Sequence, residues 1–142
     1  LNLTTALQVT QACIPTMKRQ NFGRIVNIAS EHALGMVPKR TTYGATKAGL
    51  INFAREWTLD LAPHGITANV VAPGPIETEM LLRNNPRNSP QRRDLLMRVP
   101  MGRVGQADEV AHAVAFFMSA GASYISGQTV YVCGGASLGS NL

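Results

Sequence analysis

A tyrosine and a lysine four positions apart, with a serine upstream, are the residues of this chain best suited to chemistry. Tyr43 and Lys47 lie in a segment with helical spacing, so both side chains share one face of a helix. An ammonium beside a phenol favours the phenolate form, which makes Tyr43 a candidate general acid/base. Ser30 is a candidate for holding the same substrate oxygen. Taken singly, such a Tyr–Lys pair is more often solvated, and a serine after a strand is usually a turn residue.

The elements that would position these residues alternate between helix and strand. We predict helices at 1–18, 43–62 and 108–119, and strands at 24–29, 66–72 and 128–133. The first two strands are apolar enough to be buried strands of a parallel sheet. Residues 31–42 are predicted to form a loop, and the Arg- and Pro-rich segment 76–104 a loop with a short helix at 90–98. The alternation predicts an α/β fold with three parallel strands.

The topology predicts that the candidate residues converge. Ligands of open α/β sheets bind beyond the carboxyl ends of the strands. Ser30 follows the first predicted strand, and Pro73-Gly74-Pro75 follows the second. The helix that carries Tyr43 and Lys47 connects these two strands. The convergence favours a catalytic interpretation over the solvated pair.

The beginning of the chain suggests that further sequence belongs upstream. Position 1 is Leu, and helical spacing of apolar residues starts at once. A sheet of only three strands would leave an apolar edge on its first strand, and proteins seldom leave such an edge open. We therefore expect either a partner chain over this edge or a fragment that lacks its upstream half.

Composition excludes several classes of protein. The chain has 142 residues, 45% of them hydrophobic and 15% charged, which suits one folded domain and excludes disorder. Its most apolar stretch, 110–118, is far shorter than the roughly 20 residues of a membrane-spanning helix. The net charge is +5, but its six clustered arginines have no aromatic residues among them, so we expect no nucleic-acid partner and no membrane. Two cysteines without metal or redox spacing indicate reduced thiols and a cytoplasmic protein that binds no metal.

The order of the motifs resembles the short-chain dehydrogenase/reductase family, specifically the C-terminal half of its 3-oxoacyl-carrier-protein-reductase-like members. The similarity extends over the whole chain, from Asn2-Leu3-Thr4-Thr5 through the run that ends at Ser30. Tyr43-Gly44-Ala45-Thr46-Lys47 matches the family's Y-x-x-x-K at its usual distance, thirteen residues after the serine. Pro73-Gly74-Pro75-Ile76-Glu77-Thr78 resembles its cofactor loop, and 127–135 its closing strand. Several motifs in order are far more specific than one.

The resemblance implies a role for each matching residue. Tyr43 would exchange a proton with the substrate oxygen, and Ser30 would orient that oxygen. Lys47 would bind the nicotinamide ribose and favour the phenolate, while Asn2 would help to hold a proton-relaying water. Residues that would contact the nicotinamide end of NAD or NADP are Tyr43, Lys47, Pro73, Gly74, Ile76 and Thr78. The implied fold is the C-terminal part of a doubly wound Rossmann fold, with residues 1–142 forming the catalytic part of a single domain.

The sequence also departs from the family pattern. Ala29 stands where many members have a serine, and Cys133 where an aspartate is common. No glycine-rich phosphate loop is present, so the N-terminal dinucleotide-binding half is absent from this sequence. Without that half, we do not expect the chain alone to turn over substrate. The arginine-bearing segment 77–103 occupies the position of the family's substrate lid, where it would meet a phosphorylated or carboxylated substrate or simply be solvated. His32 is close enough to Ser30 in sequence to line the substrate pocket.

Two functions follow from the sequence. The first is an NAD(P)-dependent oxidoreductase that interconverts a secondary alcohol and a ketone, with a small-molecule substrate and Tyr43 as acid/base. Its helices at 1–18 and 43–62 would pair copies of the chain into a dimer or tetramer, as the resemblance implies. The alternative is a non-catalytic fragment that keeps these helices and acts as a binding or assembly partner. The sequence specifies neither the substrate nor whether the cofactor is NAD or NADP.

Overall fold

The protein is built around a three-stranded parallel sheet. A computed structural model describes residues 2–35 and 38–139. The sheet has the order β1-β2-β3, with β1 at Gly23–Ile28, β2 at Ile66–Pro73 and β3 at Thr129–Val132. Both neighbouring pairs are parallel, with Gly23 opposite Ile66 and Val70 opposite Thr129. The α/β fold class predicted from the sequence is confirmed.

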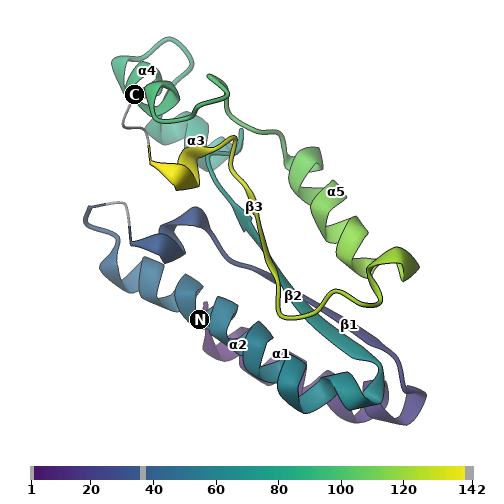
Figure 1. Ribbon diagram of the computed structural model, residues 1–142. Helices are drawn as coiled ribbons and strands as arrows, with labels where there is room; N and C mark the ends of the chain where they lie inside the picture. Colours follow the sequence, from purple (N-terminus) through teal and green to yellow (C-terminus); the bar gives the residue numbers. More distant parts are fainter. Residues whose placement is uncertain (1, 36–37, 140–142) are drawn as a thin grey trace.

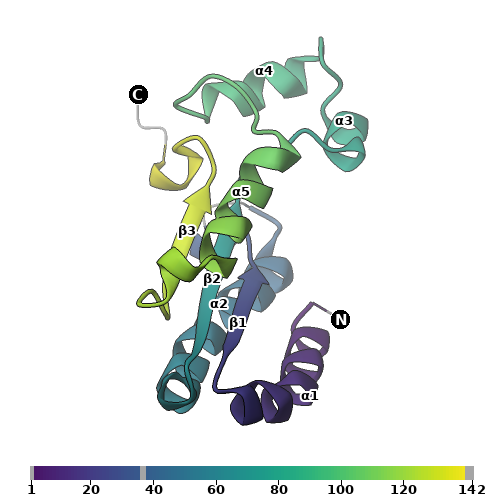
Figure 2. The same cartoon turned by 90° about the vertical axis from the view of Figure 1, so that its right-hand side faces the viewer.

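Helices cover both faces of the sheet. The first two, α1 (Thr4–Gln20) and α2 (Thr41–Leu61), lie on one face, and α5 (Ala107–Met118) lies on the other (Figures 1 and 2). All three predicted helices are therefore present. Their bounds differ slightly, because Asn2 and Leu3 form a turn before α1 and because α2 begins two residues earlier than expected. In the described part of the chain, no helix combines the length and apolarity needed to cross a bilayer.

The core lies between α2 and the sheet. It is formed by one face of β2 together with α2 side chains such as Ala54, Trp57 and Leu61. Phe53 packs against Trp57 with a ring-centroid distance of 5.2 Å. Seven successive residues of β2 are buried, as expected for the central strand of a parallel sheet. The predicted burial of this strand is confirmed.

The prediction of a buried first strand is wrong for β1. Its residues alternate between buried and partly exposed, and Ile28 is 44% exposed. The cause is its position, because β1 lies at the edge of the three-stranded sheet with β2 as its partner there. Asn27, by contrast, is buried, and its Nδ2 donates a hydrogen bond to the carbonyl of Leu50 at 3.0 Å. This bond ties β1 to the middle of α2.

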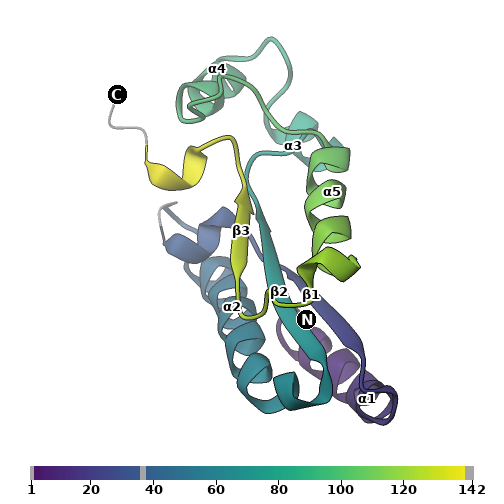
Figure 3. The ribbon, with the colours of Figure 1, turned by 45° about the vertical axis from the view of Figure 1, so that its right-hand side comes forward.

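A long connection, residues 74–106, extends away from the sheet between β2 and α5 (Figure 3). It contains the predicted short helix, α4 (Pro90–Met97), and a helix that was not predicted, α3 (Glu79–Asn84). Its two ends are fastened by hydrogen bonds from Glu77 N to Gly105 O at 2.8 Å and from Gly105 N to Pro75 O at 2.9 Å. The Glu77 carboxylate binds Arg92 of α4, which is buried.

Four short 3-10 helices complete the described chain. They are η1 (Glu31–Leu34), η2 (Ala62–His64), η3 (Ala120–Ala122) and η4 (Ala136–Leu138). The first of them lies in the segment 31–42 that was predicted to be loop throughout. It forms because Ser30 caps it, with the serine Oγ accepting a hydrogen bond from the backbone N–H of His32. This cap fixes the chain direction directly after β1.

Candidate active site

Ser30 lies at the carboxyl end of β1 and is held by its neighbour His32. The serine Oγ accepts the His32 N–H at 3.2 Å and lies 3.0 Å from His32 Nδ1. The residue is 7% exposed. The two contacts leave the hydroxyl a single defined position at the end of the strand.

Tyr43 and Lys47 lie on the first turns of α2, on the face that meets the end of β1. The Tyr43 ring packs edge-on to the His32 ring, with 5.5 Å between centroids and 76° between planes. Lys47 Nζ lies 5.7 Å from the centre of the Tyr43 ring and donates a hydrogen bond to the carbonyl of Ile28 at 2.8 Å. Partial burial lowers the pKa of Lys47 below its ordinary value. The structure thus brings Ser30, Tyr43 and Lys47 to one place, with His32 between the serine and the tyrosine.

Two contacts not anticipated from the sequence set α2 at this position. The first is the Asn27–Leu50 hydrogen bond described above. The second is the close approach of Gly44 to η1, where a Cβ on Gly44 would lie 2.7 Å from the His32 carbonyl oxygen. Only a glycine allows the helix and η1 to come this close. The only sign of this contact in the sequence is the glycine next to Tyr43. It indicates a close approach by another segment but does not show that the segment is η1.

The predicted cofactor loop begins at the end of β2, at the same edge of the sheet. The N–H of Gly74 bonds to the carbonyl of Val132 at 3.0 Å, which fastens the loop to β3. Thr78 is exposed and caps α3, its Oγ1 accepting the Leu81 N–H at 3.2 Å. Pro73, Gly74 and Ile76 are partly exposed. This edge therefore carries the Lys47 ammonium and the Thr78 hydroxyl. Groups of these kinds suit the ribose and the carboxamide of a nicotinamide nucleotide.

Asn2 is less closely tied to the site than the other predicted residues. It is exposed and lies in the turn before α1. The adjacent Leu3 packs on α2 where Gly49 leaves room, since a Cβ on Gly49 would lie 2.9 Å from Leu3 Cδ1. Asn2 is therefore near the helix that carries Lys47. Among the described residues, no hydrogen bond joins the two side chains.

Glu31 is a buried acid that the sequence analysis did not single out. One of its carboxylate oxygens, Oε2, is buried without a hydrogen-bond partner in the described part of the chain. A Cβ on Gly74 would lie 2.7 Å from this oxygen and 2.6 Å from the Cβ of Cys133, so the carboxyl is wedged against the ends of β2 and β3. Burial raises the pKa of Glu31 from 4.5 to about 7. Its place beside Ser30 in the sequence was the only hint.

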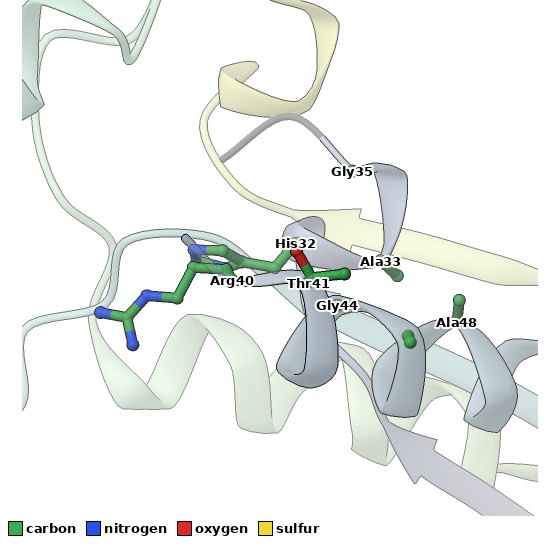
Figure 4. Close-up of a pocket in the computed structure, with 8 residues that line it drawn as sticks. His32, Ala33, Gly35, Arg40, Thr41, Gly44 and Ala48 are labelled. Carbon is green, nitrogen blue, oxygen red and sulfur yellow. The ribbon is translucent and has the colours of Figure 1, made fainter. Parts of the chain in front are cut away.

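His32 interacts with a charged side chain, Arg40, in addition to Ser30 and Tyr43. Its pKa lies below the ordinary value, first because the ring is partly buried and second because of the positive charge of Arg40. His32 is therefore a neutral hydrogen-bonding group at neutral pH. His32 borders a cavity between η1 and α2 (Figure 4), while its expected place in the substrate pocket stays a prediction. The described residues contain no group of acids, histidines or cysteines that could hold a metal ion.

Comparison with known proteins decides the family. A family model described as Enoyl-(Acyl carrier protein) reductase matches residues 1–137. The chain belongs to the short-chain dehydrogenase/reductase family. The resemblance inferred from the motifs is thereby confirmed, and so is the Rossmann-type fold that it implied.

Relatives of this short-chain dehydrogenase/reductase chain include named reductases. It is 41% identical over 134 residues to the 3-oxoacyl-[acyl-carrier-protein] reductase FabG of Haemophilus influenzae, covering 94% of this chain and 54% of that protein. It is 43% identical over 138 residues to the reductase MabA of Mycobacterium avium, covering 97% and 53%. The chain therefore spans about half the length of the curated relatives that it matches.

Solved structures show the same likeness. A gluconate 5-dehydrogenase from Burkholderia cenocepacia, in complex with NADP and tartrate, superposes with a TM-score of 0.89 at 36% identity, covering 97% of this chain and 54% of that one. A variant of actinorhodin polyketide ketoreductase with NADPH superposes with a TM-score of 0.88 at 36% identity, covering 96% and 56%. Both belong to the class of oxidoreductases that the motifs indicated.

Proposed function

We propose that this chain carries the catalytic part of an NAD(P)-dependent oxidoreductase that interconverts a secondary alcohol and a ketone. The observation that carries the proposal is the placement of Tyr43 beside Lys47 and, through His32, beside Ser30 at the carboxyl edge of the sheet. Tyr43 is 38% exposed, so its phenol is accessible to a substrate. Family membership and the reductases and dehydrogenases among the relatives support the same reaction class.

Tyr43 would be the proton donor and acceptor. During reduction its phenol gives a proton to the carbonyl oxygen, and during oxidation its phenolate takes the proton of the alcohol. The Lys47 ammonium, held near the ring, stabilises the phenolate that forms. A bound nicotinamide would supply or accept the hydride.

Ser30 would hold the substrate oxygen in line with Tyr43. Its Oγ already accepts a hydrogen bond from the backbone N–H of His32, and Nδ1 of the His32 ring is within hydrogen-bond distance of the same oxygen. When Nδ1 carries the ring proton, both lone pairs of the serine oxygen are engaged. The serine's own proton is then left to donate to the substrate oxygen.

The cofactor is expected to lie over the ends of β1 and β2. Lys47 would bind the ribose hydroxyls, and Pro73, Gly74, Ile76 and Thr78 would line the nicotinamide end. Asn2 would help to hold a water near Lys47, which is compatible with the packing of Leu3 on α2. Solved neighbours with NADP or NADPH make NADP the form to test first, although either nicotinamide cofactor suits these residues.

We infer that residues 1–142 are the C-terminal catalytic part of one domain that acts as a homo-oligomer on a small molecule in the cytoplasm. Support for pairing through α1 and α2 comes from exposed apolar side chains, including Val9, which is 59% exposed on α1. Ala45 and Ala48 are likewise exposed on α2. By contrast, Gly44 and Gly49 face η1 and Leu3 of the chain itself, so only part of the small-residue surface of α2 is open to a partner.

Tyr43→Phe tests the proposal directly. In a protein that joins this chain to a dinucleotide-binding half, we expect the variant to keep its fold, measured by circular dichroism, and to lose NAD(P)-linked turnover by about 100-fold or more, the usual contribution of a general acid/base. Tyr124→Phe is the matched control, because Tyr124 is fully exposed and far along the chain from the site. Retained activity in Tyr43→Phe would exclude the mechanism, whereas absence of turnover in the original protein would favour the non-catalytic alternative.

A further inference from the structure

A pocket of about 260 Å³ lies between η1 and the first turns of α2, and it is bordered by His32, which contacts two of the proposed catalytic residues. Its two ends differ in chemistry. Figure 4 shows Ala33 and Ala48 at one end and the side chains of His32 and Arg40 at the other. The polar end is the end next to the reaction site, because His32 contacts both Ser30 and Tyr43.

Arg40 gives the polar end its charge. Burial and, to a smaller extent, the positive charge of Arg40 lower the pKa of His32, so the histidine is neutral and Arg40 is the cation of this end. Four salt bridges occur among the described residues, and all of them use other arginines (Arg83, Arg87, Arg92 and Arg103). Within the described chain, Arg40 thus has no acidic partner.

Glu31 does not neutralise this charge, although it is the acid nearest to His32 in the sequence. Its Oε2 is buried against Gly74 and Cys133, at the ends of β2 and β3, and makes no hydrogen bond within the described residues. An arginine that shares a pocket with His32 and has no acid of its own among the described residues is suited to an anionic group on the substrate. Guanidinium pairs with carboxylate in a two-pronged geometry, and the neutral His32 ring beside it adds no competing charge.

We propose that Arg40 and His32 form a carboxylate-binding subsite, and that the substrate is a small oxo or hydroxy acid. The inference rests on the proposed function, since it names the substrate class of the same site. Because His32 contacts both Ser30 and Tyr43 and borders the same pocket as Arg40, the carboxylate would lie on the side of the pocket near the carbonyl or carbinol carbon. A substrate of this class differs from a neutral ketone or thioester by one negative charge.

Binding tests the subsite without any turnover. Succinate, which carries no reactive carbonyl, is the probe, and dimethyl succinate and inorganic phosphate are its comparisons. We expect succinate to shift the His32 ring signals in NMR spectra and dimethyl succinate to leave them unchanged. Arg40→Gln is expected to weaken succinate binding about tenfold or more, as loss of a charge-assisted pair requires. Arg19→Gln, a surface change at the far end of α1, is the matched control.

Turnover separates this inference from the proposed function. In Arg40→Gln, the ratio of kcat/KM for an oxo acid to kcat/KM for its methyl ester should fall about tenfold or more. An unchanged ratio, or phosphate binding tighter than succinate, would overturn the carboxylate subsite. If Tyr43→Phe lost all turnover while Arg40→Gln left this ratio of kcat/KM values unchanged, the proposed function would be supported and the carboxylate subsite would be excluded.

Discussion

The buried carboxyl of Glu31 gives the fold a pH dependence that can be worked out in sign. In the unfolded chain this group titrates near its ordinary value of 4.5, whereas burial raises the pKa to about 7 in the fold. The folded protein therefore favours the protonated acid. The free energy of unfolding should fall as the pH rises from about 4.5 to about 7, and this contribution should be constant above that range.

Glu31→Gln removes this titration, since glutamine has the shape of the acid without its charge. At pH 8 we expect the variant to exceed the original protein in free energy of unfolding by on the order of 1–3 kcal/mol. At pH 4.5 the two should be alike. Urea unfolding at both pH values measures the difference, with Glu56→Gln on the exposed side of α2 as the control. Equal stability of the two proteins at pH 8 would show that Glu31 is not desolvated as described.

Single residues differ in how well the sequence predicts them. Tyr43, Lys47 and Ser30 were found because helix periodicity and strand ends fix their positions before any loop is known. Glu31 and Arg40 depend on the path of the chain between β1 and α2, which no periodic pattern encodes. The polar residue Asn27 is buried and the apolar residue Ile28 is exposed, the reverse of what their polarity predicts. The amide of Asn27 is bonded to a carbonyl of α2, whereas Ile28 lies on an edge strand.

At the scale of elements, the site depends on how closely α2 approaches η1. Gly44→Ala places a methyl group 2.7 Å from the His32 carbonyl oxygen, so helix and turn must separate. Alanine favours a helix by about 1 kcal/mol over glycine, but the steric conflict should still leave a net loss of stability of about 1–2 kcal/mol. We also expect lower turnover, because Ser30 and His32 move away from Tyr43.

Gly49→Ala is the matched control for Gly44→Ala in the same helix. Its new methyl group would meet only the end of the Leu3 side chain, which can move, so helix propensity should dominate and stability should be kept or rise. Thermal unfolding and turnover of both variants give the comparison. If both variants behaved alike, the tight contact between α2 and η1 would not be what positions the site.

Elements with long periodic signals were predicted well, and short ones were not. The three strands were located to within about a residue, because each is an apolar run bounded by glycine, proline or polar residues. The six-residue helix α3 was missed, since its only signal is the capping residue Thr78 within a segment rich in arginine and proline. The closing contact between Ile76 and Gly105 joins residues far apart in the sequence and leaves no local pattern.

At the scale of the whole molecule, the inferred pairing through α1 and α2 can be broken at one residue. Val9 and Cys13 are four residues apart on α1 and both exposed, so they form an apolar strip that a partner helix would cover. Val9→Glu should convert oligomers to smaller species in sedimentation experiments without changing the helix content. Met97→Glu on α4, at a site equally open to solvent, is the control. An oligomer unaffected by Val9→Glu would place the interface elsewhere.

The sheet as a whole accounts for where the chemistry lies. Parallel strands deliver their carboxyl ends to one edge, and that edge receives Ser30 from β1, the Pro73-Gly74 loop from β2 and the β3 end beside Glu31. The prediction of convergence needed only the strand order, which is why it could be made from sequence. Which substrate the edge receives depends on side chains such as Arg40, whose placement needed the structure.

The central claim is hydride transfer at a carbonyl with Tyr43 as the proton donor. The most direct measurement supplies reduced nicotinamide cofactor deuterated at its transferable position, together with an oxo acid, and locates the label in the product by NMR. We expect deuterium on the carbinol carbon with the original protein and with Tyr124→Phe, and almost none with Tyr43→Phe. Deuterium transfer undiminished in Tyr43→Phe would contradict the account.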